Sequence, residues 1–152
     1  MITLVLPYPI SANRYWLSFY AAKLKRVMVG PTKEATAYRK EVAAIVAAAG
    51  ITAPIPGRVA VSVQLFPHRP QDWQKRMARD PLTWDDTVQC LDLDNVNKVL
   101  LDSLKGVAIE DDKWVRSLSS ERMEPDGKAR VVVRITPLVQ QVHPQSNLLE
   151  TA

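Results

Sequence analysis

The sequence has few of the residues on which several common chemistries depend. Its 152 residues include one cysteine, Cys90, and two histidines, His68 and His143. A single cysteine excludes an intramolecular disulfide, and two histidines supply little material for a histidine-rich zinc site or for a serine or cysteine triad. The phosphate-binding loops GxxxxGK[ST] and GxGxxG are also missing. These absences disfavour nucleophilic triads, zinc chemistry and the usual nucleotide-binding loops.

Long apolar runs are missing as well. No run approaches the roughly 20 residues that span a bilayer, and the N-terminus MITLVLPYPI lacks the basic start and long apolar stretch of a signal peptide. We therefore expect the protein to stay in the reducing cytoplasm.

Length and composition predict one domain. The 47% hydrophobic residues suffice for one core, and the net charge of +4 with a pI of about 9.3 weakly favours a polyanionic partner. We place the domain at residues 1–137, because Pro137 closes the last predicted strand and the polar stretch 138–152 shows no periodic face. That tail is expected to be flexible.

Apolar patterns predict a single α+β domain with two main helices and a mixed sheet, in the approximate order βαβαββ. One helix is expected between the N-cap Thr32 and the C-cap Gly50. The second is expected over residues 95–103, capped by Asp94. The strands are expected over residues 2–6, 58–66, 114–123 and 128–135, the last two joined as a hairpin by the turn EPDG.

Two segments show no sustained period. The first follows the opening strand and is expected to be a loop, and the second, residues 68–89, is expected to be a long loop with room for one short helix. Trp73, Trp84 and Trp114 fit either packing residues or platforms on which bases stack, and the two alternatives stay open.

Acidic residues are concentrated in LDLDNVNKVLLDSLKGVAIEDD. Asp92 and Asp94 alternate with leucines, so in an extended chain both carboxylates project from one face. Helical spacing then places Asp94, Lys98 and Asp102 on a shared face. Glu110, Asp111 and Asp112 follow after a short apolar link, and we expect the two acidic clusters to meet.

Clustered carboxylates repel one another unless a cation is bound. Oxygen ligands suit Mg²⁺, with Mn²⁺ as a substitute, and such a site hydrolyses phosphodiesters. Lys98 then supplies a fixed positive charge at the transition state.

Simpler explanations exist for each of these residues. Asp94 fits an N-cap, Lys98 with Asp102 fits a surface ion pair, and the acidic run at residues 110–112 fits a solvated turn. A calcium loop is disfavoured, because Val96 and Asn97 occupy a ligand position and the position of the turn glycine.

The combined motifs resemble the RusA family of Holliday-junction resolvases. The resemblance is carried by Asp92-Leu-Asp94-Asn95, Lys98, Asp102-Ser-Leu104, Gly106-Val107 and Asp111-Asp112, and by PYPISANRYW near the N-terminus. It covers most of residues 1–137.

The resemblance implies roles for individual residues. Asp92, Asp94 and Asp112 correspond to the metal-binding catalytic acids and Lys98 to the essential lysine, while the place of Asp111 stays open. The family implies a Mg²⁺-dependent homodimer that nicks two opposed strands of a four-way junction symmetrically. The N-terminal segment then becomes a candidate DNA contact, and the alternative is a solvated basic loop. Its candidate residues are Asn13, Arg14, Tyr15, Lys23, Lys25 and Arg26.

The sequence departs from the family pattern before the first aspartate. Val88, Gln89 and Cys90 stand where family members often carry basic residues, and the loop 70–89 is longer than usual. The cluster of Lys75, Arg76 and Arg79 in this loop is expected to supply the positive charge. Two alternative functions remain: a nuclease of this scaffold that cuts other branched DNA or RNA, and a junction-binding protein without catalysis.

Overall fold

A computed structural model of the protein describes residues 1–138; the expected flexible tail lies outside the described residues, apart from Leu138. Its main sheet has four strands in the order β1-β6-β4-β5. β1 (Ile2–Pro7), β6 (Arg130–Pro137) and β4 (Val59–Phe66) pair antiparallel, and β5 (Val115–Arg122) pairs parallel with β4. The mixed sheet and the α+β class predicted from the sequence are confirmed.

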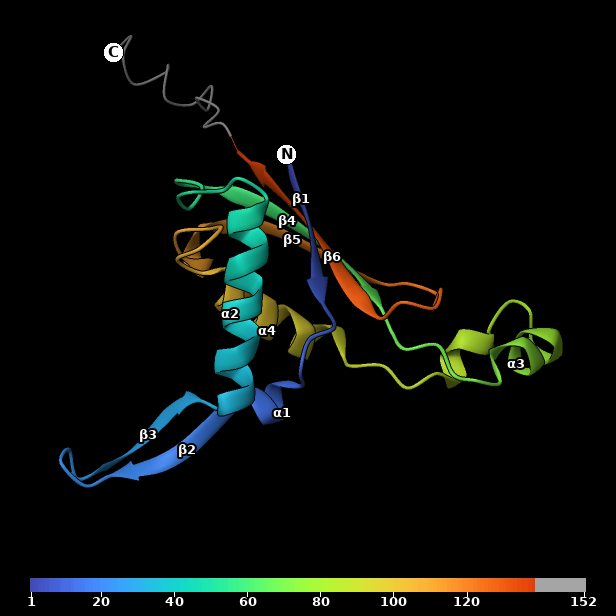
Figure 1. Cartoon of the computed structure of the whole chain (residues 1–152), viewed down its shortest axis with the longest axis horizontal. Coiled ribbons are helices and arrows are strands. Elements are labelled where there is room, and N and C mark those ends of the chain that lie inside the picture. Colours follow the sequence, from blue (N-terminus) through green and yellow to red (C-terminus); the bar gives the residue numbers. More distant parts are fainter. Residues whose placement is uncertain (139–152) are drawn as a thin grey trace, which may run out of the picture.

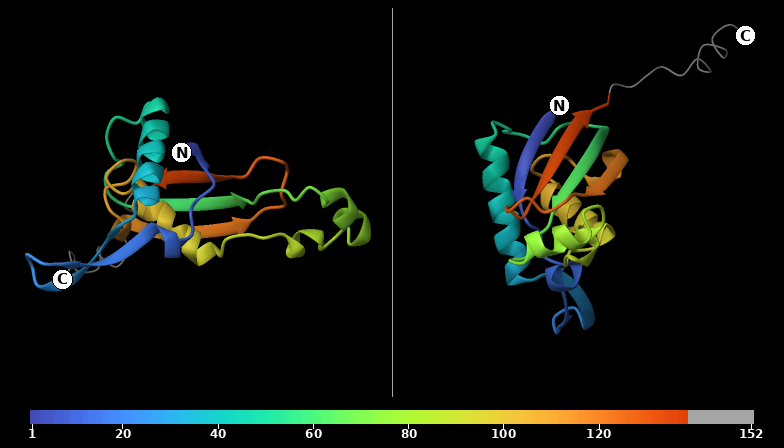
Figure 2. Two further views of the ribbon diagram at one scale, coloured as in Figure 1. Left: turned by 60° about the horizontal axis from the view of Figure 1, so that its bottom comes forward. Right: turned by 90° about the vertical axis from the view of Figure 1, so that its right-hand side faces the viewer.

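Two long helices cover one face of this sheet (Figure 2). α2 (Lys33–Ala48) begins after Thr32, whose hydroxyl accepts the Ala35 amide at 3.1 Å, as the capping signal predicts. α4 (Leu93–Leu104) buries its apolar stripe against the sheet. In β4, every second residue from Val59 to Leu65 is buried, because that face meets the helices.

The helices and strands share one apolar core. Its large members are fully or almost fully buried, and Tyr15 lies among them. Among residues 1–138, no helix combines the length and the apolar character that crossing a membrane requires.

The predicted hairpin between the last two strands is wrong. β5 and β6 do not pair with each other, because β4 lies between them and bonds to both. The Met123 amide, just after β5, donates to the Leu65 carbonyl of β4 at 2.8 Å. The segment with EPDG therefore passes over the end of β4 instead of closing a tight turn.

The predicted loop after β1 is also wrong. It contains the short helix α1 (Ala12–Tyr15) and a second sheet, in which β2 (Trp16–Ala21) pairs antiparallel with β3 (Arg26–Pro31). We call residues 16–31 the arm, since this hairpin extends away from the body of the domain (Figure 1). Lys25 turns the chain at its tip with a φ of 51°.

The long loop before α4 contains the expected short helix. α3 (Trp73–Arg79) and the 3₁₀ helix η1 (Trp84–Thr87) lie at the end of the molecule away from the arm (Figure 1). Trp84 is buried, and its indole donates to Glu124 at 2.7 Å, so this tryptophan packs. A second 3₁₀ helix, η2 (Asp112–Trp114), precedes β5.

Candidate functional site

Two exposed carboxylates stand at the start of α4. The helix begins two residues earlier than predicted, so Asp92 occupies the N-cap position and Asp94 lies in the first turn. The prediction that Asp94 is the N-cap is therefore wrong, and the LDLD segment does not run as an extended strand. The Asp92 side chain makes no capping hydrogen bond. Both acids thus lie beside the positive end of the helix dipole, which favours negative charge.

Lys98 lies one helical turn after Asp94 and is exposed. None of the salt bridges between described residues includes it. The surface ion pair between Lys98 and Asp102 is therefore not formed. The ammonium group remains available on the helix that carries the two acids.

Asp102 has a structural environment different from that of Asp94. Its carboxylate accepts from the Tyr15 hydroxyl and from both the Nε and the terminal nitrogen of Arg39, with 2.9 Å to Nε. The Arg39 Nε also lies 2.6 Å from the Tyr15 oxygen. Burial, and then the hydrogen bond to Asp102, raises the pKa of Tyr15. These contacts tie α4 to α2 and to the N-terminal segment.

The second acidic cluster lies at the other end of α4. Asp111 receives the Lys113 amide at 3.1 Å, and its Oδ2 lies 3.6 Å from the Nζ of Lys105, the residue directly after the helix. The side-chain hydrogen bond with Asp112, followed by that amide, lowers the pKa of Asp111 to about 2. Asp112 itself is exposed.

One copy of the chain does not bring the two acidic clusters together. α4 has 12 residues and therefore rises about 18 Å between them. Within residues 1–138, no group of three or more His, Cys, Asp or Glu side chains is placed to hold a metal ion. The expectation that the clusters meet is wrong for a single copy, because the sequence spacing does not reveal that the helix separates them.

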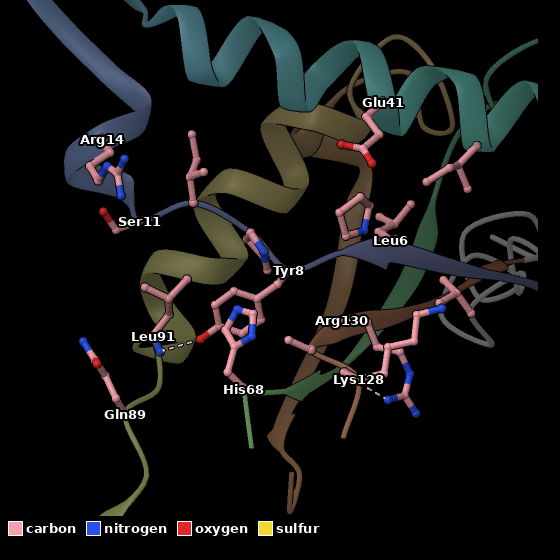
Figure 3. A pocket seen from close by; sticks show the side chains of 16 residues that line it. Leu6, Tyr8, Ser11, Arg14, Glu41, His68, Gln89, Leu91, Lys128 and Arg130 are labelled. Atoms are coloured by element: carbon pink, nitrogen blue, oxygen red, sulfur yellow. Dashed lines mark hydrogen bonds between the residues drawn. The ribbon is translucent and has the colours of Figure 1, made fainter. Parts of the chain in front are cut away.

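Sequence reasoning missed Tyr8 as a neighbour of the acids. Its hydroxyl accepts the Leu91 amide at 3.1 Å, so it fixes the backbone directly before Asp92 (Figure 3). Tyr8 and Leu91 both line a hollow of about 920 Å³. The available signal was the position of Tyr8 within PYPISANRYW, the N-terminal stretch that carries part of the family resemblance.

The candidate DNA contacts fall into three groups. Asn13 and Arg14 are exposed on α1, where Arg14 pairs with Glu34 at 2.9 Å. The second group, at the tip of the arm, is Lys23, Lys25 and Arg26, all exposed. The third is Lys75, Arg76 and Arg79, which share α3 and line one hollow.

Tyr15 has to be removed from the candidate contacts. Its side chain is completely buried and bonds to Asp102, which leaves no surface for DNA. Tyr15 was named because it belongs to the N-terminal segment that carries the family resemblance, but the structure buries its side chain at the end of α1.

Comparison with known proteins identifies the family. The model of the family Endodeoxyribonuclease RusA matches residues 7–136. A comparison with curated proteins found no match. The match includes both ends of α4, the whole of β4 and β5, and β6 except its last residue, whereas Pro7 is the only residue of β1 within it. The chain therefore belongs to the RusA family of endodeoxyribonucleases, hydrolases that resolve Holliday junctions.

Proposed function

We propose that this protein resolves four-way DNA junctions by Mg²⁺-dependent hydrolysis of phosphodiesters, with paired and symmetric nicks. The observation that carries the proposal is the pair of exposed carboxylates at the start of α4, Asp92 and Asp94, which have no cationic partner among the described residues. They lie next to a hollow with arginine and lysine in its lining, as a site for a charged phosphodiester requires.

A hard divalent cation fits these side chains. RusA-family nucleases depend on divalent metals in general, and carboxylate oxygens are the protein ligands that Mg²⁺ accepts, with Mn²⁺ as a substitute. Asp92, Asp94 and Asp112 are the residues that we assign to the ion. When bound, Mg²⁺ supplies charge stabilisation and a more acidic water. Lys98 holds a further positive charge one turn from Asp94, where it stabilises the phosphate oxygens.

Asp112 joins this site only from a second copy in our proposal. Within one chain, α4 separates it from Asp94 by roughly the length of the helix. A two-fold homodimer that sets the start of one α4 against the end of the other completes two equivalent sites. Two sites related by symmetry match two opposed strands of a four-way junction.

The arm supports the proposed homodimer. Six large apolar side chains on it are 47–67% exposed: Leu17, Phe19, Tyr20, Leu24, Val27 and Val29. The register puts Phe19 and Met28 on one face and Tyr20 and Val27 on the other, so both faces are apolar. Between Trp16 and Ala22, and between Val27 and Pro31, the arm carries no charge. Such a ribbon is marginal in water and suits burial against protein.

We further propose that the basic groups of α1, of the arm tip and of α3 contact the phosphate backbone. They lie in three separate parts of the chain, and each is exposed or lines a hollow. Contacts of this kind position the DNA without reading its sequence. A protein that acts on DNA in a reducing compartment fits our expectation of a cytoplasmic location.

The central experiment compares substrates and metals. Labelled four-way junction, flap, fork and linear duplex of matched sequence are incubated with Mg²⁺ or with EDTA, alongside Asp94→Asn. We expect paired nicks in the junction that disappear with EDTA or in the variant. Cutting spread over the other substrates supports the broader branched-DNA or RNA nuclease, and tight binding without any cut supports the junction-binding protein.

The shared site is tested by mixing two inactive variants. Asp94→Asn and Asp112→Asn are unfolded together and refolded, so that mixed dimers form. A mixed dimer then contains one site with both substitutions and one intact site, and we expect it to nick one strand. If both acids act within one copy, each site keeps one substitution and the mixture stays inactive. Each variant refolded alone is the control.

A further inference from the structure

Tyr8 and His68 form a wall between two hollows next to the start of α4. Their ring centroids are 5.0 Å apart and the rings are inclined by 60°. The larger hollow, of about 920 Å³, and a smaller one, of about 530 Å³, both include these two rings and Leu91 in their linings. Figure 3 shows the two rings side by side, with Tyr8 reaching Leu91. An aromatic pair thus stands between two open spaces beside the acids.

Positive charge borders the wall on each side. The larger hollow is lined by Arg14, Lys128 and Arg130, opposed by Glu41 alone. The smaller hollow is lined by Arg69 and Arg76, and no acidic residue lines it.

Three of these five cations already have a carboxylate partner: Arg14 pairs with Glu34, Arg76 with Asp72 and Arg130 with Asp126. The cations that remain available to a ligand are Lys128 and Arg69. Lys128 forms none of the salt bridges between described residues. Arg69 lies over the Trp73 ring, 4.3 Å from its centroid, and has no carboxylate partner in that part of the chain. A polyanionic chain that passes the wall therefore meets positive charge before and after it.

The wall is fixed relative to the acids. The Tyr8 hydroxyl accepts the Leu91 amide at 3.1 Å, and Leu91 directly precedes Asp92. His68 is exposed at the end of β4, whereas Tyr8 is half-buried. One ring is thus anchored in the fold and the other is open to a ligand, which is how a stacking platform is built.

We propose that Tyr8 and His68 form a stacking site for one unpaired nucleobase of the DNA strand that is cut, with the flanking phosphates held by Lys128 on one side and Arg69 on the other. This inference rests on the proposed function, since it assigns the DNA element that the site next to Asp92 receives. Aromatic faces accept any base, and the nearby cations accept the phosphates on both sides of it. A fully paired duplex does not offer a free base face, so the site selects DNA whose stacking is interrupted, as at the crossover of a junction.

The first test separates the rings from charge and from folding. Affinity for a fluorescent four-way junction and for a matched linear duplex is measured in EDTA with wild type, His68→Ala, His68→Phe and Tyr8→Phe. We expect His68→Ala to weaken junction binding by roughly 5- to 150-fold, the range that corresponds to loss of one aromatic stacking partner. His68→Phe and Tyr8→Phe keep a ring and should stay within about two-fold. Duplex affinity should change little in all variants.

The second test removes the base instead of the ring. Junctions with one abasic nucleotide at each of the four positions beside the crossover are bound by wild type and His68→Ala. At one position the loss caused by His68→Ala should disappear, because no base is left to stack, as in a double-mutant cycle across the interface. Equal losses at all positions, or equal losses on duplex, overturn the stacking site, and so does His68→Phe binding as weakly as His68→Ala.

Failure of this inference differs from failure of the proposed function. If the wild type nicks junctions with Mg²⁺ but His68→Ala binds them normally, the nuclease proposal stands and the stacking site is refuted. If the wild type binds junctions through these rings but cuts nothing with any divalent metal, the stacking site for a base at the crossover stands, whereas the nuclease proposal and the assignment of that base to a cut strand are refuted.

Discussion

Asp94 and Asp102 stand two turns apart on the same helix, and we predict opposite consequences when each is replaced by alanine. Asp102→Ala should lower stability strongly and leave the chemistry of the folded protein intact. Asp94→Ala should abolish cleavage and leave stability almost unchanged. Both variants replace an aspartate of α4 with alanine, so the change in helix propensity is the same in both and cancels when the two are compared.

The magnitude for Asp102 follows from its partners. Hydrogen bonds to a charged group contribute about 1.5–3 kcal/mol, but Arg39 and Asp102 are 37% and 28% exposed, so solvent weakens their pair. The buried Tyr15 hydroxyl loses its acceptor, although Ser103 Oγ remains 3.4 Å away. The higher helix propensity of alanine offsets roughly 0.5 kcal/mol of this loss in stability. The net loss is about 2–3 kcal/mol, a fall in melting temperature of about 4–12 °C for a chain of this length.

For Asp94 the terms nearly cancel. Replacing Asp94 removes the favourable interaction of its carboxylate with the helix dipole, about 0.3–1 kcal/mol. The higher helix propensity of alanine stabilises the helix by about 0.5 kcal/mol. Urea denaturation followed by circular dichroism measures both variants, and junction cleavage is assayed at a temperature where both are folded. The reasoning is refuted if the free energy of unfolding of Asp102→Ala lies within about 0.5 kcal/mol of the wild-type value. It is also refuted if Asp94→Ala is less stable than Asp102→Ala.

Three further outcomes are expected. Mg²⁺ at about 100 times its Kd should stabilise the wild type by about 2.7 kcal/mol, and Asp92→Asn should lose this gain; an unchanged Mg²⁺ response in the variant contradicts the metal site. Replacing the three basic residues of α3 with alanine should weaken junction binding and reduce its salt slope by about 2–3, and an unchanged slope excludes phosphate contacts there. Burial raises the pKa of Tyr15 and Tyr38 in the folded protein above 10, the ordinary tyrosine pKa. Their contribution to the free energy of unfolding is therefore fully present below pH 10, where both hydroxyls are protonated in the folded and in the unfolded chain. That contribution should be lost above pH 10, and a melting temperature that stays flat from pH 9 to 11.5 contradicts it.

Elements whose signals are local were predicted well. Thr32 and Gly50 bracket α2 because a capping hydroxyl and a left-handed glycine act within one turn of the chain. β4 was predicted because one of its faces meets the core and alternation records that directly. The order of the main elements followed from these local patterns.

Pairings between distant segments were not predictable in the same way. The turn EPDG is a local hairpin signal, yet the partner of both flanking strands is β4, more than 50 residues upstream of the last one. The arm was missed for a different reason. Both of its faces are apolar, so its strands show no alternation, and its turn lacks the usual glycine.

The acids show how far spacing alone determines a site. Helical spacing placed Asp94, Lys98 and Asp102 on one face, and α4 is a helix over this range. The spacing could not reveal that Arg39, from α2, pairs with Asp102, while Asp94 and Lys98 form no salt bridge with any residue of the described range 1–138. Partners of a charged residue are set by tertiary packing, so equal positions in a sequence pattern acquire different roles.

The positions of the acids at the two ends of α4 suggest that the proposed dimer is needed to complete each active site. Asp94 and Asp112 lie at opposite ends of one helix, and within residues 1–138 of a single copy no group of three or more His, Cys, Asp or Glu side chains is placed to hold a metal ion. In the proposed dimer, cleavage requires assembly, and assembly on a two-fold axis completes both sites together. The proposal then predicts that a monomer on ordinary duplex DNA lacks a complete set of acids and leaves the duplex intact. It also predicts that a dimer seated on a four-way junction has both sites complete before the first nick, which favours a second nick before the junction is released.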